Sequence, residues 1–516
     1  MSLAAAEKAT RDPDELALAD ERMRLTWREL DPILNRATNA LIAEQASQDH
    51  QRVAVFATNS VETVLAHLAG LHAGVSTVPV NFHFTVEELT YILQDSGASA
   101  IFTGPETLET ARKAAEIAGV KRVIAWRSPA TDGVTSWEAR LEAASPAEPP
   151  TDMRSRPHLH YTSGTTGRPK GVETPPTMFP RCDTVAELFE ALRATAATMG
   201  DRSPNLVVSP LYHTGPMGSV RLLGGGVAVV VMSRLDAEQV LRTIEAFKVK
   251  STLMVPTHFQ RLLALPEEVR TKYDVSSLRV VSHTGAACPV DTKRRMIEWF
   301  GPVLLEAYGA TESGTTNSIT SQEWLEKPGS VGKTLPPFEL LVISEEGERL
   351  GAKQVGQLYF RDTTGRGIVY HNDEAKTRAA HLEPGVFTLG EVGYFDDDGY
   401  VFITDRVSDM IVSGGVNIYP AETEQVLIQH PAVADVVVIG APNEEMGEEV
   451  KALVAPHDPR NPPSTADLDA FCRARLAGFK CPRSYDFVGD VGRNAMGKVN
   501  KRALRRKYWP SERTIG

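Results

Sequence analysis

Tyr161-Thr162-Ser163-Gly164-Thr165-Thr166-Gly167-Arg168-Pro169-Lys170-Gly171 is the stretch from which the fold of this chain can be inferred. Its three glycines allow backbone N–H groups to turn toward an anion, the hydroxyls of its four Ser and Thr residues add hydrogen-bond donors, and Lys170 adds a positive charge. A Walker A loop has a different spacing, with four residues between its first glycine and Gly-Lys-Ser/Thr. Because the stretch also follows a strand-like run at His158–Tyr161, we interpret it as another kind of phosphate-binding loop rather than a solvated turn.

Helical patterns, such as those over Val61–Ala73 and Val86–Ser96, alternate with short β-rich runs on both sides of this loop. Such alternation is typical of βαβ units around a mostly parallel sheet. We therefore expect an α/β fold in which the large N-terminal part holds two related subdomains. The β-rich runs before the loop are Arg52–Phe56, Ser76–Val80 and Ala100–Phe102, and those after it are Asn205–Ser209, Gly226–Met232, Ser251–Val255 and Arg279–Ser282.

Two further regions complete the predicted architecture. From Glu346 the pattern changes to short strands separated by Gly and Asp turns, which indicates a β-hairpin-rich region. The expected strands are Gln357–Arg361, Val386–Thr388 and Tyr400–Thr404. Residues 406–516 then combine helices with strands and are numerous enough for an independent domain. We predict a large N-terminal domain over residues 1–405 and a small, mobile α+β cap over residues 406–516, with a short hinge and a cleft between them.

The composition excludes several classes of protein. The chain has 516 residues, of which 42% are hydrophobic and 23% charged, so it is globular and too long for one compact core. Its 66 acidic residues outnumber its 55 Lys and Arg residues, and the net charge of −11 argues against a broad surface for nucleic acid or anionic lipid. An anionic ligand must therefore bind at a local site.

The lack of a signal-like series and the scattered cysteines together favour a cytoplasmic location. No signal-like series opens the chain, and the apolar stretch Val227–Met232 is far shorter than the roughly 20 residues that a membrane span needs. The four cysteines show neither a C-x-x-C pair nor a histidine at metal-ligand spacing. We expect a cytoplasmic protein with reduced cysteines, without an integral membrane segment and without structural zinc.

The loop and six later motifs together resemble the adenylate-forming superfamily, which includes acyl-CoA synthetases, luciferases and the adenylation domains of peptide synthetases. One such motif could arise by chance, but a set in the order of the family is specific. The resemblance extends from about residue 25 to residue 505. The motifs are Pro210-Leu211-Tyr212-His213-Thr214-Gly215-Pro216, Tyr308-Gly309-Ala310-Thr311-Glu312-Ser313, Gly390-Glu391-Val392-Gly393, Asp405-Arg406, Ser413-Gly414-Gly415-Val416-Asn417-Ile418-Tyr419-Pro420-Ala421-Glu422 and Gly497-Lys498.

This resemblance implies an enzyme, namely an AMP-forming acid–thiol ligase of the acyl-CoA synthetase type. ATP and a small-molecule carboxylic acid would form an acyl-adenylate and diphosphate. Coenzyme A would then take the acyl group and release AMP. The implied cofactors are ATP, Mg²⁺ and coenzyme A.

The resemblance also implies roles for individual residues. Lys498 would bridge the substrate carboxylate and the α-phosphate, Thr311 would donate to the α-phosphate, and Glu312 would bind Mg²⁺. A lysine suits the first role because its compact charge on a flexible stem can be delivered and withdrawn. The residues implied to bind ATP or AMP are Thr162, Ser163, Gly164, Thr165, Thr166, Gly167, Lys170, Gly285, Ala286, Ala287, Tyr308, Gly309, Glu391 and Arg406.

Two positions depart from the family pattern. The ribose is usually bound by the Asp of a Gly-Asp pair, but here Glu391 follows the glycine. The hinge residue of the C-terminal domain is usually Asp or Lys, and the matching residue is Ser408. After rotation about this hinge, the loop around Gly414 and Gly415 would form one wall of a tunnel for the thiol arm of coenzyme A. Glu391 would therefore affect how ATP is positioned, and Ser408 would affect how fast the C-terminal domain rotates. Neither departure would change the reaction itself.

The same motifs suggest where the acid binds. His213 matches a position at which the family often has a gate between acyl pocket and thiol tunnel, although a lone histidine is also often a packed residue. Tyr212, Gly224 and Gly225 are expected to line or flank the pocket, where successive glycines would leave room. We therefore expect a medium- or long-chain acid, or a bulky alicyclic acid of the steroid or bile-acid side-chain type.

Two other functions stay open. The chain could load its acyl group onto the thiol of a carrier protein instead of coenzyme A. It could also be a nucleotide-binding pseudoenzyme, which Glu391 and Ser408 suggest but Lys498, Glu312 and the phosphate loop oppose. The sequence identifies neither the acid nor the oligomeric state, for which a homodimer is one option.

Overall fold

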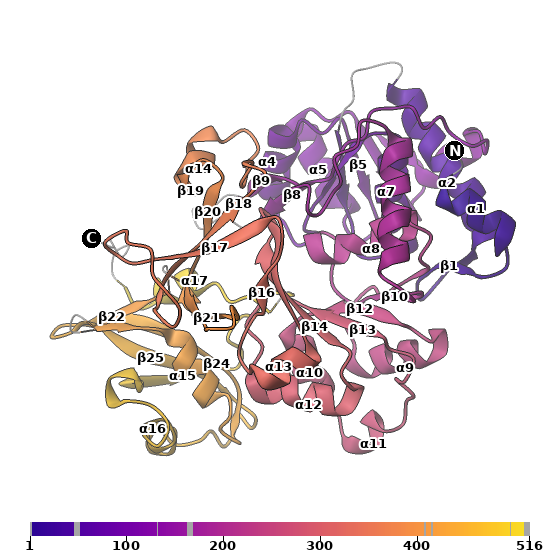
Figure 1. Cartoon of the computed structure of the whole chain (residues 1–516). Coiled ribbons are helices and arrows are strands. Elements are labelled where there is room, and N and C mark those ends of the chain that lie inside the picture. The colour runs from indigo at the N-terminus through magenta and orange to yellow at the C-terminus, as the bar shows by residue number, and fades with distance from the viewer. Residues whose placement is uncertain are drawn as a thin grey trace.

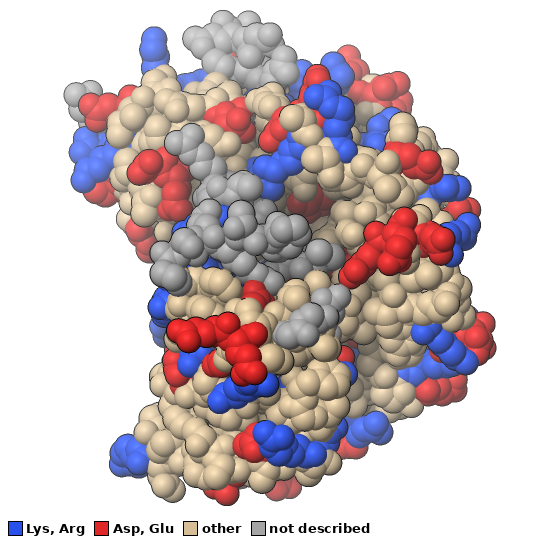
Figure 2. Space-filling model, turned by 90° about the vertical axis from the view of Figure 1, so that its left-hand side faces the viewer, with Lys and Arg blue, Asp and Glu red and all other residues tan. Residues whose placement is uncertain are grey.

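The computed structural model describes residues 3–45, 52–131, 133–162, 169–406, 409–413, 416–495 and 497–509. Figure 1 shows a large N-terminal part and, at the lower left, a smaller C-terminal part that contains β22, β24 and β25. Positive and negative side chains are interspersed over the face seen in Figure 2. Within the described ranges, no helix is both long and apolar enough to cross a membrane.

The first subdomain is a five-stranded parallel sheet covered by helices on both faces (Figure 1). Along β3, Val53 and Val55 join one hydrophobic cluster, whereas Ala54 and Phe56 join another on the opposite face. The sheet order is β4 (Ser76–Pro79), β3 (Arg52–Phe56), β5 (Ala100–Thr103), β6 (Arg122–Ala125) and β7 (Val134–Ser136), with α2 (Trp27–Gln45), α3 (Val61–His72), α4 (Val86–Ser96), α5 (Leu108–Ala118) and α6 (Trp137–Ala143) around it.

The second subdomain is a nine-stranded sheet whose central strands are parallel. It is also buried on both faces, because Val229 and Val231 pack into one cluster and Val230 into another. The predicted α/β fold is therefore confirmed. The sheet order is β16 (Lys333–Thr334), β15 (Gly314–Thr320), β14 (Leu304–Ala310), β13 (Val280–His283), β12 (Ser251–Met254), β10 (Asn205–Val207), β11 (Val229–Val231), β1 (Leu16–Ala19) and β2 (Arg24–Thr26).

The helices of this subdomain lie between or after its strands in the chain, except α1, which precedes them. They are α1 (Ala4–Arg11), α7 (Val185–Thr198), α8 (Thr214–Gly224), α9 (Ala237–Phe247), α10 (Pro256–Leu263), α11 (Glu267–Arg270), α12 (Val290–Phe300) and α13 (Ser321–Glu326).

The predicted hairpin-rich region forms an antiparallel sheet. Its strand β20 runs to Phe395, well past the expected end at Thr388, because its second half pairs with β21. The strands are β17 (Phe338–Ile343), β18 (Gly356–Asp362), β19 (His381–Glu383), β20 (Val386–Phe395) and β21 (Val401–Arg406), and α14 (Glu374–Ala379) precedes β19. A separate antiparallel hairpin consists of β8 (Leu159–Thr162) and β9 (Lys170–Glu173).

The C-terminal part has a sheet and a hydrophobic core of its own. β21 of the N-terminal part ends at Arg406 and β22 begins at Ile411, so the change of sheet falls next to the predicted boundary. Its elements are β22 (Ile411–Ser413), β23 (Val416–Ile418), α15 (Pro420–Leu427), β24 (Val433–Asn443), β25 (Gly447–Pro456), α16 (Thr465–Arg473), the 3-10 helix Gly478–Lys480, β26 (Ser484–Phe487) and α17 (Lys501–Arg505).

Candidate active site

The hairpin of β8 and β9 brings the two ends of the predicted phosphate loop together. Thr162 and Lys170 face each other in the antiparallel register, so the loop begins and ends at the same place. The predicted loop residues Ser163, Gly164, Thr165, Thr166 and Gly167 lie outside the described residues.

Glu312 lies beside the first of these two ends. It occupies the turn between β14 and β15, and Thr162 Oγ1 donates to its Oε1 at 3.4 Å. The hydroxyl of Tyr370 donates to the same oxygen at 3.3 Å. Two motifs that are far apart in the sequence therefore meet at one carboxylate.

The residues around Glu312 fit a magnesium ion that enters with a nucleotide. Among the described residues there is no group of three or more His, Cys, Asp or Glu side chains placed to hold a metal ion. Mg²⁺ is commonly bound by one or two carboxylates together with substrate phosphates and waters. A single carboxylate beside a phosphate-type loop suits that arrangement.

Two lysines flank the ring of Tyr370. Lys170 Nζ lies 5.5 Å from the ring centroid and Lys376 Nζ lies 5.8 Å from it. Partial burial, followed by the neighbouring charge of Lys376, lowers the pKa of Lys170 to about 8. Two close ammonium groups that repel each other are favourably placed to receive an anion such as a polyphosphate.

Thr311 meets the start of α8. Its Oγ1 lies 2.8 Å from Oγ1 of Thr214, and His213 is the residue that precedes the helix. The ring centroids of His213 and Tyr212 lie 4.3 Å apart, and those of Tyr212 and Phe82 lie 5.4 Å apart. The hydroxyl of Thr311 is thus held at the end of α8 from which His213 and Tyr212 extend.

His213 is neutral at physiological pH. Burial of its ring and, to a smaller extent, the positive charge of Lys498 together lower its pKa to about 3. The electrostatic influence of Lys498 on His213 shows that the two side chains are near each other, although they belong to different domains.

The loop that carries Lys498 rests on the N-terminal domain. A Cβ added at Gly497 would lie 3.0 Å from Thr257 Cγ2 on α10. Within the loop, the Lys498 amide donates to Asn494 Oδ1 at 3.0 Å. The structure therefore places the loop of the predicted lysine against α10, with Lys498 close enough to His213 to influence its pKa.

The predicted adenosine residues lie on neighbouring strands. Tyr308 of β14 donates through its hydroxyl to Glu391 Oε2 at 2.9 Å, and Glu391 is buried. Gly309 must lack a side chain, because a Cβ there would lie 2.0 Å from the carbonyl oxygen of Gly314. Arg406 pairs with Glu391 along β21, but its side chain lies outside the described residues.

Gly285, Ala286 and Ala287 follow β13, the parallel neighbour of β14. Gly285 has a φ of +92°, a conformation that favours glycine, so the chain can turn sharply after the strand. In open α/β sheets, ligands bind outside the carboxyl ends of parallel strands. This position suits an adenine-binding wall beside Tyr308.

The prediction that Gly224 and Gly225 leave room for the acid is wrong. A Cβ at Gly224 would lie 2.7 Å from Phe189 on α7, and one at Gly225 would lie 2.9 Å from the carbonyl oxygen of Leu192. Both glycines therefore allow α8 and α7 to approach closely, and they leave no space for an acid. The predicted hinge Ser408 and tunnel residues Gly414 and Gly415 lie outside the described residues.

Some residues of the site were not identified from the sequence. Thr214 directly follows Tyr212 and His213 in the sequence, so its hydroxyl can be recognised from the sequence as a candidate for the same site. Tyr370 and Lys376 lie in no such motif, and only the fold places them beside Lys170.

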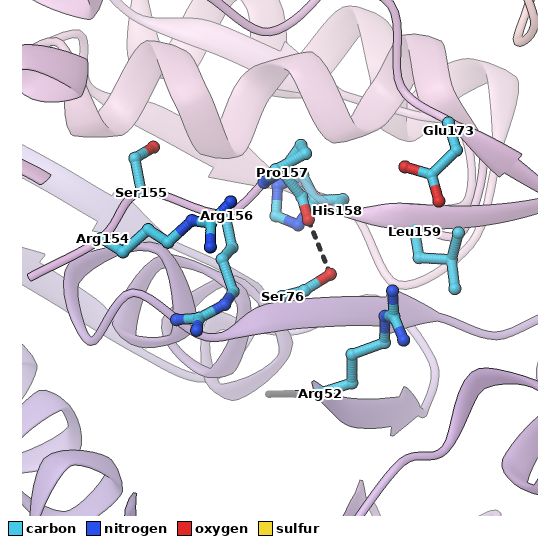
Figure 3. Close-up of a pocket in the computed structure, with 9 residues that line it drawn as sticks. All are labelled: Arg52, Ser76, Arg154, Ser155, Arg156, Pro157, His158, Leu159 and Glu173. Atoms are coloured by element: carbon cyan, nitrogen blue, oxygen red, sulfur yellow. Dashed lines mark hydrogen bonds between the residues drawn. The ribbon is translucent and has the colours of Figure 1, made fainter. Parts of the chain in front are cut away.

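A separate cavity of approximately 200 Å³ lies beside the other end of the β8–β9 hairpin. Figure 3 shows that its arginines come from β3 and from the segment before β8. Ser76 Oγ donates to the carbonyl oxygen of Pro157 at 2.6 Å, the bond that is dashed in Figure 3. None of the predicted catalytic residues lines it. Its lining residues are Arg52, Ser76, Arg154, Ser155, Arg156, Pro157, His158, Leu159 and Glu173.

Comparisons with known proteins agree with this geometry. The family model described as AMP-binding enzyme matches residues 5–367, and that described as AMP-binding enzyme C-terminal domain matches residues 422–498. The first covers well over half of the chain.

Curated relatives and a solved structure are similar over nearly the whole length. The "3-[(3aS,4S,7aS)-7a-methyl-1,5-dioxo-octahydro-1H-inden-4-yl]propanoyl:CoA ligase" of Rhodococcus jostii (strain RHA1) is 33% identical, with 97% of each chain covered. The feruloyl-CoA synthase of an Amycolatopsis species is also 33% identical, with 97% of each covered. The o-succinylbenzoate CoA synthetase of Bacillus subtilis, solved with its acyl-adenylate intermediate, has a TM-score of 0.79 at 27% identity and 98% coverage of both chains.

Proposed function

The chain belongs to the AMP-binding enzyme family of the adenylate-forming superfamily and is an AMP-forming acid–CoA ligase, and from this premise we propose that its acid is medium- or long-chain or bulky and alicyclic. The name of the Rhodococcus relative, which contains a fused-ring propanoyl group, supports a bulky acid. The observation that carries the proposed mechanism is the approach of Lys498, from the C-terminal domain, to His213 of the N-terminal domain.

In the first step, the carboxylate of the acid must approach the negatively charged α-phosphate of ATP. ATP supplies the electrophilic α-phosphate, and Mg²⁺ neutralises part of the phosphate charge when bound. Lys498 would hold the attacking carboxylate and the α-phosphate together, and Thr311 would donate to the α-phosphate from its fixed place beside Thr214. Glu312 would hold the Mg²⁺, and Lys170 with Lys376 would bind the outgoing diphosphate.

The second step needs the lysine to leave, because it has no role in attack on the mixed anhydride. We assign the hinge to Ser408 and one wall of the thiol tunnel to Gly414 and Gly415. His213 is neutral, so as a gate it would present a polar ring without adding charge next to the thiol. The free cysteines of the chain fit a reducing cytoplasmic setting, and a homodimer stays a prediction.

A panel of acids tests the proposed function. The full-length enzyme is given ATP, Mg²⁺ and each acid, with and without coenzyme A, and both AMP and acyl-CoA are measured. We expect AMP release that depends on coenzyme A with at least one medium-chain, long-chain or alicyclic acid. Acid-dependent diphosphate exchange without any acyl-CoA would favour transfer to a carrier protein. No exchange with any acid would overturn the proposed function.

A further inference from the structure

Helix α8 carries a partly buried arginine, Arg221, for which the described part of the structure offers no counter-ion. Arg221 makes no hydrogen bond or ion pair with any residue that the structure describes, and its Nη1 is buried without a partner. Burial lowers its pKa to about 10, so the guanidinium is still charged at neutral pH. An unpaired buried charge is costly, whereas a pair with an anion compensates much of the cost.

The guanidinium lies on the face of α8 that leads to the active site. Thr214, Gly218 and Arg221 are spaced as i, i+4 and i+7, so they lie along one face of the helix. Thr214 at the start of this face contacts Thr311. Long helical side chains point back toward the N-terminus of the helix, and Arg221 accordingly reaches Gly218.

Open space lies over Gly218. Apart from the residues next to Gly218 and the backbone of α8 itself, the only described atom within 4 Å of a Cβ added there would be Nη2 of Arg221, at 3.6 Å. Both Gly218 and Arg221 are partly accessible to solvent. This differs from Gly224, where neighbouring side chains fill the corresponding space. A ligand that extends from Thr311 along α8 would therefore pass over Gly218 and reach the guanidinium.

Two histidines of β8 and the segment before it complete the surroundings of Arg221. His160 is buried, and neither of its ring nitrogens has a partner among the described residues. Its pKa is lowered to about 3 by burial first and then by the charge of Arg221, with a smaller effect of His213. His158 is buried next to it, with its Nε2 unpartnered. Neutral imidazoles offer N–H donors, so the region combines one cation with donors.

We propose that the acid carries a second carboxylate, which Arg221 and His160 bind while the body of the acid lies over Gly218. This inference rests on the proposed function and narrows its substrate class to dicarboxylic acids. Thr214 and Gly218 are separated by roughly 6 Å along the axis at 1.5 Å per residue. An aliphatic diacid such as adipate or pimelate, or an alicyclic diacid, spans such a distance, whereas malonate is too short.

The test compares acids of equal length with one and two carboxylates. Acyl-CoA formation by the full-length enzyme is measured with adipate and hexanoate and with pimelate and heptanoate. We expect kcat/KM to be at least about 10-fold higher for the diacid, in line with a hydrogen-bonded charge pair. In Arg221→Met, the diacid should lose about 10- to 100-fold while the monoacid and the KM for ATP change little. Arg221→Lys should retain part of the preference.

Two further measurements keep the inference falsifiable. Arg242→Met removes an exposed arginine of α9 and should leave the preference for diacids unchanged. Because no described residue compensates the charge of the partly buried Arg221 side chain, Arg221→Met should have a Tm no lower than that of the parent enzyme. Diacids should raise the Tm of the parent only.

Different failures have different meanings. Preference of the parent enzyme for monocarboxylic or fused-ring keto acids over every diacid would overturn the second carboxylate while sparing the ligase function. An unchanged diacid preference in Arg221→Met would do the same. Absence of acyl-CoA with every acid, mono- or dicarboxylic, would overturn the proposed function itself.

Discussion

Glu391 offers the sharpest test at the scale of a single residue. It is 5% exposed and accepts a hydrogen bond from Tyr308 at 2.9 Å, so a ribose bound there would meet a carboxylate that is already held in place. Hydrogen bonds to charged groups are worth about 1.5–3 kcal/mol. We expect Glu391→Gln to raise the Kd for ATP by about 10- to 100-fold, whereas Glu391→Asp stays within a modest factor. Isothermal titration calorimetry measures both.

Glu374 provides a matched control for the loss of one negative charge. It is exposed on α14 and pairs only loosely, at 3.6 Å, with Arg378. Glu374→Gln should leave the affinity for ATP unchanged. If Glu391→Ala also bound ATP as tightly as the parent enzyme, the ribose role would be refuted.

Single residues also show where sequence reasoning succeeds and where it stops. Thr162 and Glu312 lie in recognisable motifs, and the structure brings them within 3.4 Å of each other. Arg221 and Tyr370 stand in no such pattern, because the side chains that surround them come from distant elements of the fold. Gly224 was misread because the same residue type either opens a pocket or lets two helices touch, and only packing distinguishes these cases.

At the scale of elements, an ion pair joins helix α12 to strand β14. Lys293 and Glu306 are both buried, and β14 also carries Tyr308 of the nucleotide site. Removing one partner of such a pair leaves an unpaired buried charge and costs about 3–5 kcal/mol. We expect Lys293→Met to lower the Tm by roughly 4–6 °C. Differential scanning calorimetry at neutral pH measures this change.

The contribution of the Lys293–Glu306 pair to stability can be checked through its pH dependence and through a double variant. Burial raises the pKa of Glu306, and Lys293 opposes that rise. Without the lysine, Glu306 takes up a proton more readily, so the loss in Tm should shrink as the pH falls. Lys293→Met combined with Glu306→Leu should recover most of the stability. A loss no larger than that of Lys248→Met, which breaks an exposed pair, would contradict the buried-pair account.

Elements were more predictable than their ends. The apolar run of β3 and the helix over Val86–Ser96 follow from periodicity, because both are buried as the pattern requires. The length of β20 was missed, since its second half is defined by pairing with β21 rather than by its own sequence. Local patterns thus predict that an element exists, while its partners determine where it ends.

For the whole molecule, the decisive contact is the one between the two domains at Gly497. Its φ is +70°, and Thr257 of α10 would lie 3.0 Å from an added Cβ. A larger side chain at this position would hold the lysine loop away from the N-terminal domain. We expect Gly497→Val to slow acyl-adenylate formation by about 10-fold or more, as a misplacement of about 1 Å can cost 100-fold. Thioester formation from a supplied acyl-adenylate should change little, because that step does not use Lys498.

Gly492 separates the loss of docking from backbone strain. It has a φ of +78°, close to that of Gly497, but an added Cβ would meet no described atom within 4 Å. Gly492→Val therefore carries similar strain without the interdomain clash, and it should leave adenylate formation nearly unchanged. Lys498→Ala should abolish adenylate formation and spare the thioester step, which sets the reference for complete loss. If Gly497→Val slowed both half-reactions equally, or if Gly492→Val were just as slow in the first, then contact with Thr257 would not be what positions the lysine, and the two-domain mechanism would lose its structural basis.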